Sequence, residues 1–479
     1  MTAIGLLACL GLLWIVSTWI ARLRTRYTYG VARGAIVVGF FHPYCSAGGG
    51  GERVLWRAIH ALAGLGDAKG KRFHVLVYTG DVGKAPEDIL DSARRQFQIP
   101  LDVAIPIDFV VLRGRSLLDP ACYPVMTMML QSLGSFFVGL EALARATPEV
   151  FMDTTGFAFT FSAAFLFSCK IGAYVHYPTI STDMLRRVRD RRPAYNNRGW
   201  ISSSATVSYA KLLYYRTFAA LYGLAGAHAG EVMVNSTWTQ RHIAAIWWRS
   251  NPVVVFPPCD TADLKRLPIN HEGRGRYALS VGQFRPEKEH ALQVAALAEL
   301  RRRGAGFADV RLVIVGSCRG DADRGVLARV QETAAAVGVA DGVDFVVNCS
   351  FQELRARLGA ASVGLHTMWN EHFGIGVVEM MAAGLVTIAH RSGGPLADIV
   401  VAGPSGSPPG FLAETPAEYA DIMADVFGEC PSRDYRAVRE AGRESAGRFS
   451  DAAFDKGFAE SFAHLVWPRT PPATASPSR

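Results

Sequence analysis

Two glutamates in the second half of the chain lie on either side of a glycine-containing segment that can bind a ligand. Glu371 and Glu379 frame the sequence EHFGIGVVE, whose glycines allow the backbone to approach a bound molecule closely. Their spacing exceeds two helical turns, so we expect Glu371 on a loop and Glu379 on the inward face of the following helix. An acidic side chain inside an apolar helix is costly unless it binds something. The pattern predicts a ligand site, with a structural salt bridge as the alternative.

A pair of cations follows an apolar run in the same half. Arg285 and Lys288 are separated by two residues and come directly after residues 277–284. Ligands of open α/β sheets bind at the carboxyl ends of strands, and two cations with this spacing at the mouth of a helix can face one diphosphate. Most isolated pairs of this kind lie on solvated surface, so it is their position after a strand that favours a diphosphate site.

The first half contains four consecutive glycines, Gly48 to Gly51, followed by Glu52. They lie between an apolar run and a predicted helix, where glycines allow a sharp turn and free N–H groups at a helix start favour an anion. The spacing differs from the G-x-G-x-x-G fingerprint, which argues against a dinucleotide-dependent dehydrogenase. The segment predicts a ligand-binding loop, with a flexible turn as the alternative.

These candidate residues require a scaffold, and alternating apolar runs and helical segments predict one. Strand-like runs occur at 35–41, 74–81, 108–114, 150–156, 171–178, 231–237, 277–284, 310–317, 343–348, 361–367 and 385–395. Strands that alternate with helices form βαβ units with a parallel sheet. We therefore expect two α/β, Rossmann-like domains. The predicted organisation is an anchor (1–26), an N-terminal domain (27–252), a linker (253–272), a C-terminal domain (273–455), and a helix with a disordered tail (456–479).

The N-terminus predicts a membrane anchor. Residues 3–21 are apolar and uncharged, long enough as a helix to cross about 30 Å of hydrocarbon. Arg22, Arg24 and Arg26 follow and place that end, and the body of the protein, on the cytosolic side. A cleaved signal peptide is the alternative, but no charged segment precedes the apolar run and no clear cleavage site follows it.

Three further apolar segments bear on membrane contact. Buried helices of the sheet layers are the expectation for 124–140 and 157–169. Residues 207–227 follow a basic run at 186–192 and mix aromatic with cationic side chains, as an interfacial helix does. Membrane contact and burial both stay open for this third segment.

The composition excludes several classes of protein. The chain has 479 residues, 50% of them hydrophobic, and a net charge of +8. It is neither disordered nor collagen-like nor a small disulfide scaffold, and its eight scattered cysteines indicate reduced thiols. Because no zinc-finger spacing or RNA-binding motif occurs, we expect no nucleic acid partner. Asp321 and Asp323 have the D-x-D spacing of some metal sites, but no histidine is near, and we expect no metal or other cofactor.

Together the motifs resemble the retaining GT-B glycosyltransferases of family 4. Five segments narrow the resemblance to the α-1,2-mannosyltransferases of the dolichol pathway of asparagine-linked glycosylation: FFHPYCSAGGGGERVLWRAI (40–59), YVHYPTIS (174–181), FPPCD (256–260), SVGQFRPEKEH (280–290) and MWNEHFGIGVVEMMAAG (368–384). The likeness covers about residues 36–465, and the anchor matches too.

The resemblance implies a function and its setting. It implies two Rossmann-like domains facing a central cleft, with an N-terminal transmembrane helix. The donor would be GDP-mannose, and the acceptor a dolichyl-diphosphate-linked oligosaccharide that receives its fourth and fifth mannoses. The enzyme would work on the cytosolic face of the endoplasmic reticulum membrane, with other mannosyltransferases of the pathway as candidate partners.

The resemblance also implies roles for individual residues. Arg285 and Lys288 would bind the diphosphate and stabilise the leaving GDP, Glu379 would bind the ribose, and Glu371 would lie beside the mannose. His176 would lie near the sugar, with a core histidine as the alternative. Substrate contacts would also come from Gly49, Gly50, Gly51, Glu52, Phe373, Gly374 and Ile375. No carboxylate is assigned as a nucleophile, so front-side displacement assisted by the leaving phosphate is expected.

Two other functions stay open at this stage. One is a related GT-B enzyme with a different sugar donor or lipid acceptor, because donor specificity depends on pocket shape. The other is a catalytically silent scaffold subunit. The presence of Glu371, Glu379, Arg285 and Lys288 argues against a silent chain, which has no chemical need for them.

Overall fold

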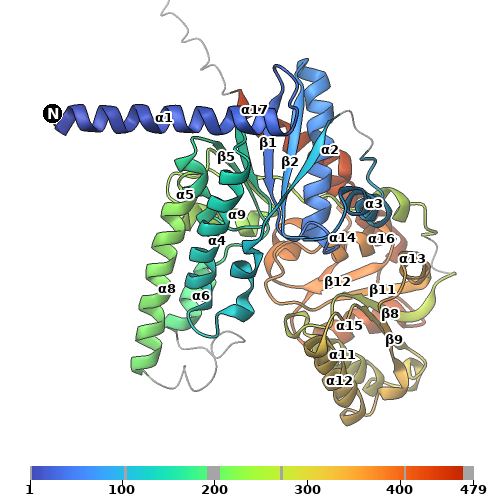
Figure 1. The fold of residues 1–479 in the computed structure, drawn as a ribbon. Helices are drawn as coiled ribbons and strands as arrows, with labels where there is room; N and C mark the ends of the chain where they lie inside the picture. Colours follow the sequence, from blue (N-terminus) through green and yellow to red (C-terminus); the bar gives the residue numbers. More distant parts are fainter. Residues whose placement is uncertain (1–2, 102–104, 191–204, 270–272, 404–405, 468–479) are drawn as a thin grey trace, which may run out of the picture. The chain divides into compact units, whose positions relative to one another are not determined.

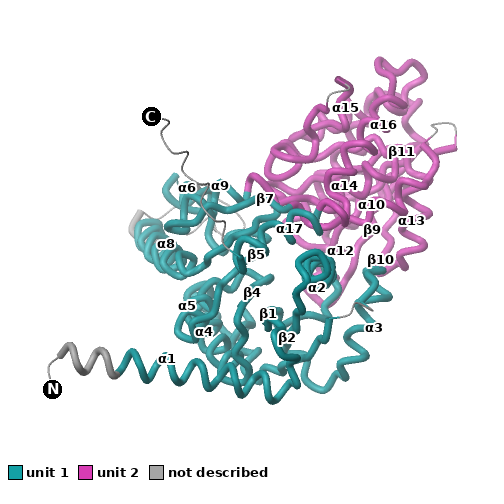
Figure 2. The backbone as a smooth tube through the Cα atoms, turned by 90° about the horizontal axis from the view of Figure 1, so that it is seen from above, with its two compact units in different colours: residues 1–235, 239–255, 454–479 teal, residues 236–238, 256–453 magenta. Residues whose placement is uncertain are grey.

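The computed structural model describes residues 3–101, 105–190, 205–269, 273–403 and 406–467 (Figure 1). The chain divides into two compact units (Figure 2). Unit 1 consists of Met1–Asn235, Thr239–Val255 and Phe454–Arg479, and unit 2 of Ser236–Trp238 and Phe256–Ala453. The tail predicted at 468–479, and parts of the linker and of the basic run, lie outside the described residues.

Unit 1 is built on a parallel sheet of seven strands in the order β3-β2-β1-β4-β5-β6-β7. The strands are β1 (Ile36–Phe41), β2 (Phe73–Thr79), β3 (Ile107–Val111), β4 (Val150–Asp153), β5 (Lys170–Val175), β6 (Glu231–Val234) and β7 (Val253–Val254). The order reverses between β1 and β4, and the carboxyl ends of strands at such a reversal form the usual ligand site of open α/β sheets.

Helices cover both faces of this sheet. They are α2 (Gly50–Lys69), α3 (Pro86–Phe97), α4 (Thr127–Arg145), α5 (Phe159–Leu166), α6 (Thr182–Arg189), α8 (Ala205–Gly226), α9 (Thr237–Ile246) and α17 (Asp451–Val466). Successive strand residues face opposite sides. In β1, Phe41 therefore joins a core with Phe161 of α5 and Phe218 of α8, whereas Phe40 joins a second core with Trp56 of α2 and Phe458 of α17. Burial on both faces explains why the strands read as continuous apolar runs.

Unit 2 repeats this architecture with six parallel strands in the order β10-β9-β8-β11-β12-β13. Its strands are β8 (Gly275–Val281), β9 (Arg311–Gly316), β10 (Val343–Val347), β11 (Ala361–His366), β12 (Val386–His390) and β13 (Phe411–Ala413). Its helices include α10 (Thr261–Leu264), α11 (His290–Arg302), α12 (Asp321–Ala336), α13 (Phe351–Ala360), α14 (Ile375–Ala382), α15 (Pro416–Phe427) and α16 (Tyr435–Ser445). The strand order reverses between β8 and β11.

The two Rossmann-like units predicted from the sequence are confirmed, and every predicted strand run contains a strand. Two short strands were not predicted. β7 lies within the segment interpreted as a linker, and β13 lies in a segment to which no strand was assigned. Both are edge strands of two or three residues, and their extended conformation is defined by pairing with β6 and β12 rather than by a local pattern.

The N-terminal helix α1 (Ala3–Thr28) extends from unit 1 (Figure 1). Its described apolar side chains are largely exposed, for example Leu13 at 65% and Trp19 at 62%. Its carboxyl-terminal part is attached to the unit, since Arg26 forms an ion pair with Glu149 at 2.7 Å and Arg22 donates a hydrogen bond to the carbonyl of Ser168 at 2.6 Å. The helix is thus docked through its carboxyl-terminal part, while most of its described apolar side chains stay exposed.

The predicted burial of the apolar helices is only partly confirmed. α4 buries Val138 and Leu143 against the sheet but exposes Leu133 and Phe137. By length and composition, α4 is also the one helix among the described residues that passes a test for a membrane span, with 33% of its apolar stretch buried. Exposed apolar side chains continue onto α5 and α8, at Phe165, Leu166, Leu213, Leu221 and Leu224.

Candidate functional site

The strand-order reversal of unit 2 brings Lys288 and Glu371 into contact. Lys288 ends a 3₁₀ turn, η3 (Pro286–Lys288), which follows β8, and Glu371 lies on the loop after β11. The Lys288 ammonium donates a hydrogen bond to Oε2 of Glu371 at 2.7 Å. Nε2 of His366 lies 3.2 Å from the same oxygen, while Oε1 accepts the His372 backbone N–H at 3.2 Å. A cation, a carboxylate and an imidazole therefore converge where α/β sheets usually bind ligands.

The Glu371 carboxylate remains ionised in this setting. Its side chain is only 14% exposed, and burial raises its pKa, but the hydrogen bond from His366 and the charge of Lys288 outweigh burial and hold the pKa well below the usual range. The Lys288 ammonium has three donors, and it also contacts Sδ of Met368 at 3.3 Å. Nδ1 of His366 is buried and has no partner among the described residues. Buried nitrogens are normally satisfied, so this atom indicates a position for water or ligand.

Hydrogen bonds fix the turn that carries Lys288. The Thr367 hydroxyl donates to the Lys288 carbonyl at 2.9 Å and accepts from Nε2 of Gln293 at 2.9 Å. His290, which is 3% exposed, bonds the carbonyl of Gln283 at 3.1 Å. Sequence reasoning missed His366 and Thr367 as site residues. They end the predicted strand 361–367, and their position at a strand's carboxyl end was the available signal.

The loop after Glu371 turns into helix α14, as predicted. Gly374 precedes the helix with a φ of +111°, a conformation that favours glycine over any other residue. Phe373 is 3% exposed and packs its ring against Phe256 and Phe449, at centroid distances of 5.8 and 5.2 Å. The helix then carries Glu379, which is half-buried. Glu371 thus lies on the loop and Glu379 on the helix, as the spacing indicated.

Arg285 is placed differently from Lys288. It precedes η3 with an extended backbone and is exposed. Within the described residues its guanidinium has no hydrogen bond or ion pair. The structure therefore brings Lys288 and Glu371 together but leaves Arg285 as an unpaired cation on the same turn.

The strand-order reversal of unit 1 carries a second polar cluster around the glycine loop. His42, just after β1, places Nδ1 2.8 Å from the hydroxyl of Thr154 and Nε2 3.4 Å from Oε1 of Glu52. The Glu52 carboxylate also accepts the backbone N–H of Gly49, which closes the start of α2. Burial raises the pKa of Glu52, but the hydrogen bond and charge of His42 and the backbone hydrogen bonds to the carboxylate together outweigh burial and lower the pKa below its usual value. Glu52 therefore anchors the loop as an anion.

His176 follows β5 and lies beside this loop. Its Nε2 donates a hydrogen bond to the carbonyl of Thr154 at 3.1 Å. A Cβ atom added to Gly51 would lie 3.6 Å from the same Nε2, which shows how close the ring is to the loop. The structure thus groups Gly51, Glu52 and His176 in unit 1, together with His42 and Thr154, which the sequence interpretation did not include.

Asp153, at the end of β4, is a further residue that was missed. It is fully buried and accepts hydrogen bonds from the backbone N–H groups of Thr155 at 3.1 Å and Gly156 at 2.8 Å. Burial raises its pKa to about 6 despite these bonds. Asp153 therefore holds the turn after β4 next to His42.

Asp321 and Asp323 lie in the first turn of α12 and have local partners. Asp321 pairs with Arg324, and Asp323 accepts the backbone N–H of Arg319 at 2.9 Å. No group of three or more His, Cys, Asp or Glu residues with metal-binding geometry occurs within the described parts of the chain. The seven cysteines whose side chains are described are all free.

The two parallel-sheet units, each with a polar cluster at its strand-order reversal, have the architecture of the GT-B glycosyltransferases. Solved structures support the fold. An α,α-trehalose-phosphate synthase (UDP-forming) from Burkholderia xenovorans has a TM-score of 0.60 at 11% identity, covering 89% of this chain and 100% of that chain. A sucrose-phosphate synthase from Thermosynechococcus elongatus has a TM-score of 0.59 at 16% identity, covering 90% and 99%. The model of "Glycosyl transferases group 1" matches residues 263–444.

The sequence comparisons identify the family. The model of "ALG11 mannosyltransferase N-terminus" matches residues 35–247. A Mus musculus relative is 46% identical over 90% of this chain and 87% of its own length, and a Xenopus laevis relative is 41% identical over 96% and 94%. Both are named GDP-Man:Man(3)GlcNAc(2)-PP-Dol alpha-1,2-mannosyltransferase, as is a human relative at 44% identity over 90% of this chain and 87% of its own length. The chain belongs to this family of mannosyltransferases, which confirms the resemblance seen in the sequence.

Proposed function

We propose that this protein transfers mannose from GDP-mannose in α-1,2 linkage to a dolichyl-diphosphate-linked oligosaccharide, adding the fourth and fifth mannoses for protein N-glycosylation. The observation that carries the proposal is the contact between Lys288 and Glu371 at the strand-order reversal of unit 2. The contact occurs in a chain that aligns with relatives named for this activity over almost their whole length.

Unit 2 supplies the groups that a sugar nucleotide needs. Negative charge develops on the departing GDP, and a cation already oriented toward it stabilises the transition state. Lys288 is held by Glu371 and by its turn, and the exposed Arg285 would add a second positive charge. These two cations would take the place of a metal ion. Glu371 would accept hydrogen bonds from mannose hydroxyls, and Glu379 from the ribose.

The free backbone N–H groups at the start of α14 complete this part of the proposal. The first residues of a helix have N–H groups without intrahelical partners, and these favour an anion. Phe373, Gly374 and Ile375 lie at this start, so their backbone would meet sugar or phosphate. The buried ring of Phe373 serves to hold the loop in place.

Unit 1 would bind the acceptor and orient the attack that sets the configuration of the product. His176 and the loop Gly49 to Gly51, held by Glu52, would lie next to the reacting sugar. We assign no covalent intermediate. The acceptor hydroxyl would attack from the face that GDP leaves, and the departing phosphate would take its proton, so the product keeps the α configuration.

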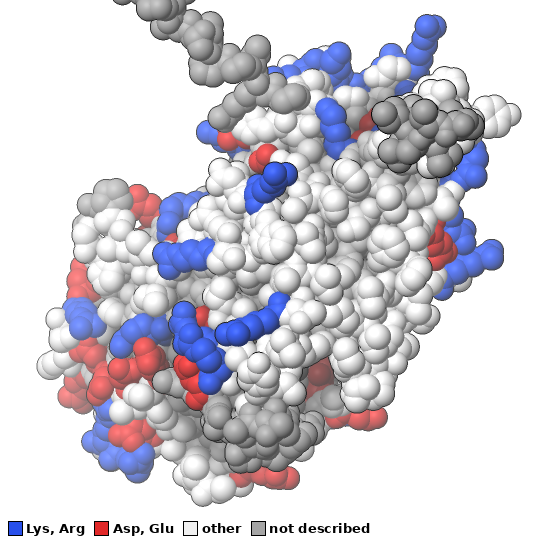
Figure 3. Space-filling view, turned by 90° about the vertical axis from the view of Figure 1, so that its left-hand side faces the viewer, with Lys and Arg blue, Asp and Glu red and all other residues white. Residues whose placement is uncertain are grey.

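A membrane-bound acceptor would explain why unit 1 exposes apolar side chains. We propose that the first part of α1 crosses the endoplasmic reticulum membrane and that its arginines mark the cytosolic boundary. Exposed apolar side chains of α4, α5 and α8 would rest in the interface. In Figure 3 the side that carries α8 has a broad area without Lys, Arg, Asp or Glu, in keeping with lipid contact.

The decisive experiment is incubation of the full-length protein with GDP-mannose and a lipid-linked trimannosyl acceptor, followed by sizing of the glycan. Two added mannoses that an α-1,2-specific mannosidase removes are expected. Lys288→Ala should reduce transfer by about 10²–10³-fold, whereas Arg324→Ala, on the exposed start of α12, should leave it unchanged. Transfer only from a different nucleotide sugar would point to a related enzyme. If no donor supports transfer, the result would point to a scaffold subunit.

A further inference from the structure

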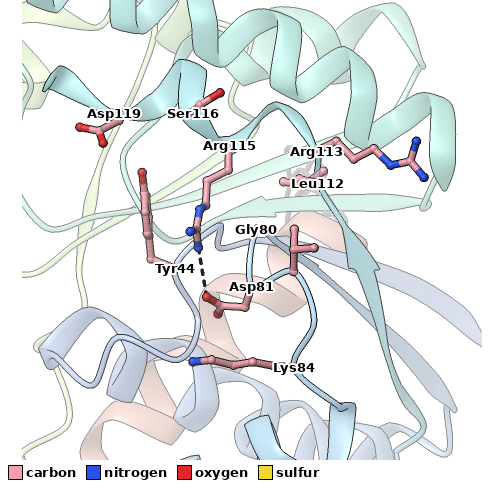
Figure 4. Close-up of a pocket in the computed structure, with 10 residues that line it drawn as sticks. Tyr44, Gly80, Asp81, Lys84, Leu112, Arg113, Arg115, Ser116 and Asp119 are labelled. Carbon is pink, nitrogen blue, oxygen red and sulfur yellow. Dashed lines mark hydrogen bonds and ion pairs between the residues drawn. The ribbon is translucent and has the colours of Figure 1, made fainter. Parts of the chain in front are cut away.

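Unit 1 contains a cavity of about 630 Å³ at the carboxyl ends of β1, β2 and β3 (Figure 4). Its volume lies within the range of about 300–1,000 Å³ that is usual for small-molecule sites. Polar lining residues come from the three loops that follow these strands: Tyr44, Asp81, Lys84, Arg113, Arg115, Ser116 and Asp119. None of them belongs to the cluster of His42, Glu52 and His176.

Asp81 connects this cavity to the glycine loop. One carboxylate oxygen accepts the backbone N–H of Ser46 at 3.2 Å and its hydroxyl at 2.8 Å, while the other faces Arg115 at 3.1 Å. Gln96 donates to the carbonyl of Gly48 at 2.9 Å and holds the next part of the same loop. The segment from Tyr44 to Gly51 therefore has the cavity at one end and His176 at the other.

The lining matches a polyhydroxylated ligand better than an anion. Lys84, Arg113 and Arg115 offer donors, whereas the carboxylates of Asp81 and Asp119 offer acceptors, and Tyr44 adds an aromatic ring. A diphosphate would meet both carboxylates as like charges. Sugar hydroxyls donate and accept at once, so they can satisfy such a mixed lining, and the C–H face of a sugar ring can pack on an aromatic ring.

We propose that this cavity binds sugar units of the acceptor oligosaccharide that are not being extended. The proposal rests on the function proposed above and adds the site that recognises the acceptor core. The oligosaccharide core bound in this cavity would be the same in both additions, while the end that receives mannose would lie at the glycine loop. Both mannose additions should therefore depend on the cavity to a similar extent.

Arg115 is the lining residue whose position is most clearly restricted by its neighbours. Its side chain lies directly over Gly80, where an added Cβ would be 2.1 Å from Cδ of Arg115. Its guanidinium also stacks over the Tyr44 ring, 5.3 Å from the centroid. Gly80→Ala would therefore displace Arg115 without removing its charge. Arg95 offers a matched control, because it is an exposed arginine on α3 of the same unit and does not line the cavity.

The test measures transfer with full-length Arg115→Gln, Gly80→Ala and Arg95→Gln proteins. Loss of hydrogen bonds from a charged donor to sugar should raise the KM for the lipid-linked trimannosyl acceptor about tenfold in the first two variants. The KM for GDP-mannose should stay the same, as should all constants of Arg95→Gln. An unchanged acceptor KM in both Arg115→Gln and Gly80→Ala would overturn the proposal while leaving the transferase function intact.

A binding measurement separates the site from the reaction. Lipid-free trimannosyl oligosaccharide should show NMR saturation transfer with the wild-type protein and about tenfold weaker binding with Arg115→Gln. This result would support the site even if no mannose were transferred, in which case the proposed function alone would fail. If inorganic diphosphate displaces the oligosaccharide from the wild-type protein and loses its own binding in Arg115→Gln, the cavity is an anion site and the proposal is wrong.

Discussion

Lys288 and Glu371 lie 83 positions apart in the chain, yet their side chains meet with 2.7 Å between Nζ and Oε2. Both are largely shielded from solvent, with side-chain exposures of 25% and 14%. The contact holds a cation in one orientation beside a carboxylate that stays ionised. In the proposed reaction this is the arrangement that meets the charge of the departing nucleotide without reorganisation.

The pair should be energetically coupled. Lys288→Met and Glu371→Gln should each lower the free energy of unfolding, because each leaves a shielded polar group with fewer partners. The double variant should then lose less than the sum, with a coupling of about 0.5–3 kcal/mol. Chemical denaturation of the four proteins measures it. The exposed pair Asp321 and Arg324 should show little coupling in the same assay; strict additivity for Lys288 and Glu371 would contradict the structure.

The lowered pKa of Glu371 predicts a specific pH dependence of stability. Its folded pKa lies below its unfolded value, so its stabilisation is fully present above about pH 5 and is lost as the pH falls toward the folded pKa. Thermal unfolding midpoints of the wild-type protein and Glu371→Gln should therefore differ most at neutral pH, and the difference should shrink progressively as the pH falls below about 4. A gap that widens on acidification would show that the carboxyl group is not ionised in the folded protein.

Gly374→Ala should damage the loop that presents Glu371. The φ of +111° strains any other residue, and an added Cβ would lie 3.2 Å from Val377 Cγ2. We expect a loss of stability of about 1–3 kcal/mol. Gly376→Ala is the control, since φ there is not positive and its Cβ would approach only the Val281 carbonyl, at 3.6 Å. Equal losses in the two variants would refute the conformational explanation.

Helix α17 should be essential to the stability of unit 1. Phe458 is fully buried and stacks with Phe454 and Phe462 at centroid distances of 5.7 and 5.9 Å. Phe458→Ala should cost about 3–5 kcal/mol in unfolding free energy. Phe165→Ala removes an equally large side chain that is 53% exposed, and it should have little effect on denaturation in detergent.

Membrane contact should affect turnover only when the acceptor lies in a bilayer. Replacing Phe137, Phe165 and Leu213 together by serine removes exposed apolar area from three helices. We expect slower transfer to acceptor in vesicles and unchanged transfer to the same acceptor in detergent. Identical loss in both conditions would mean that the substitutions disturb the fold rather than membrane contact.

The sequence by itself determined the class of the fold and several of the residues that the structure groups at the two strand-order reversals. Continuous β-branched runs identify strands that are buried on both faces. The strand ends where ligands bind are marked by a glycine loop followed by Glu52 in one half and by cations directly after a strand in the other. These patterns arise from local periodicity and local backbone freedom, so they are visible in the chain alone. The loop position of Glu371 and the helical position of Glu379 followed from the same reasoning.

Only the tertiary structure decided which of these residues meet. His366 and Thr367 join Lys288 and Glu371 because β11 pairs with β8 although two strands lie between them in the chain. His42, Thr154 and Asp153 meet because β4 pairs with β1 in the same way. The cavity around Asp81 likewise depends on three loops brought together by sheet order. Strand order and register result from packing between distant segments, a property that no local pattern encodes.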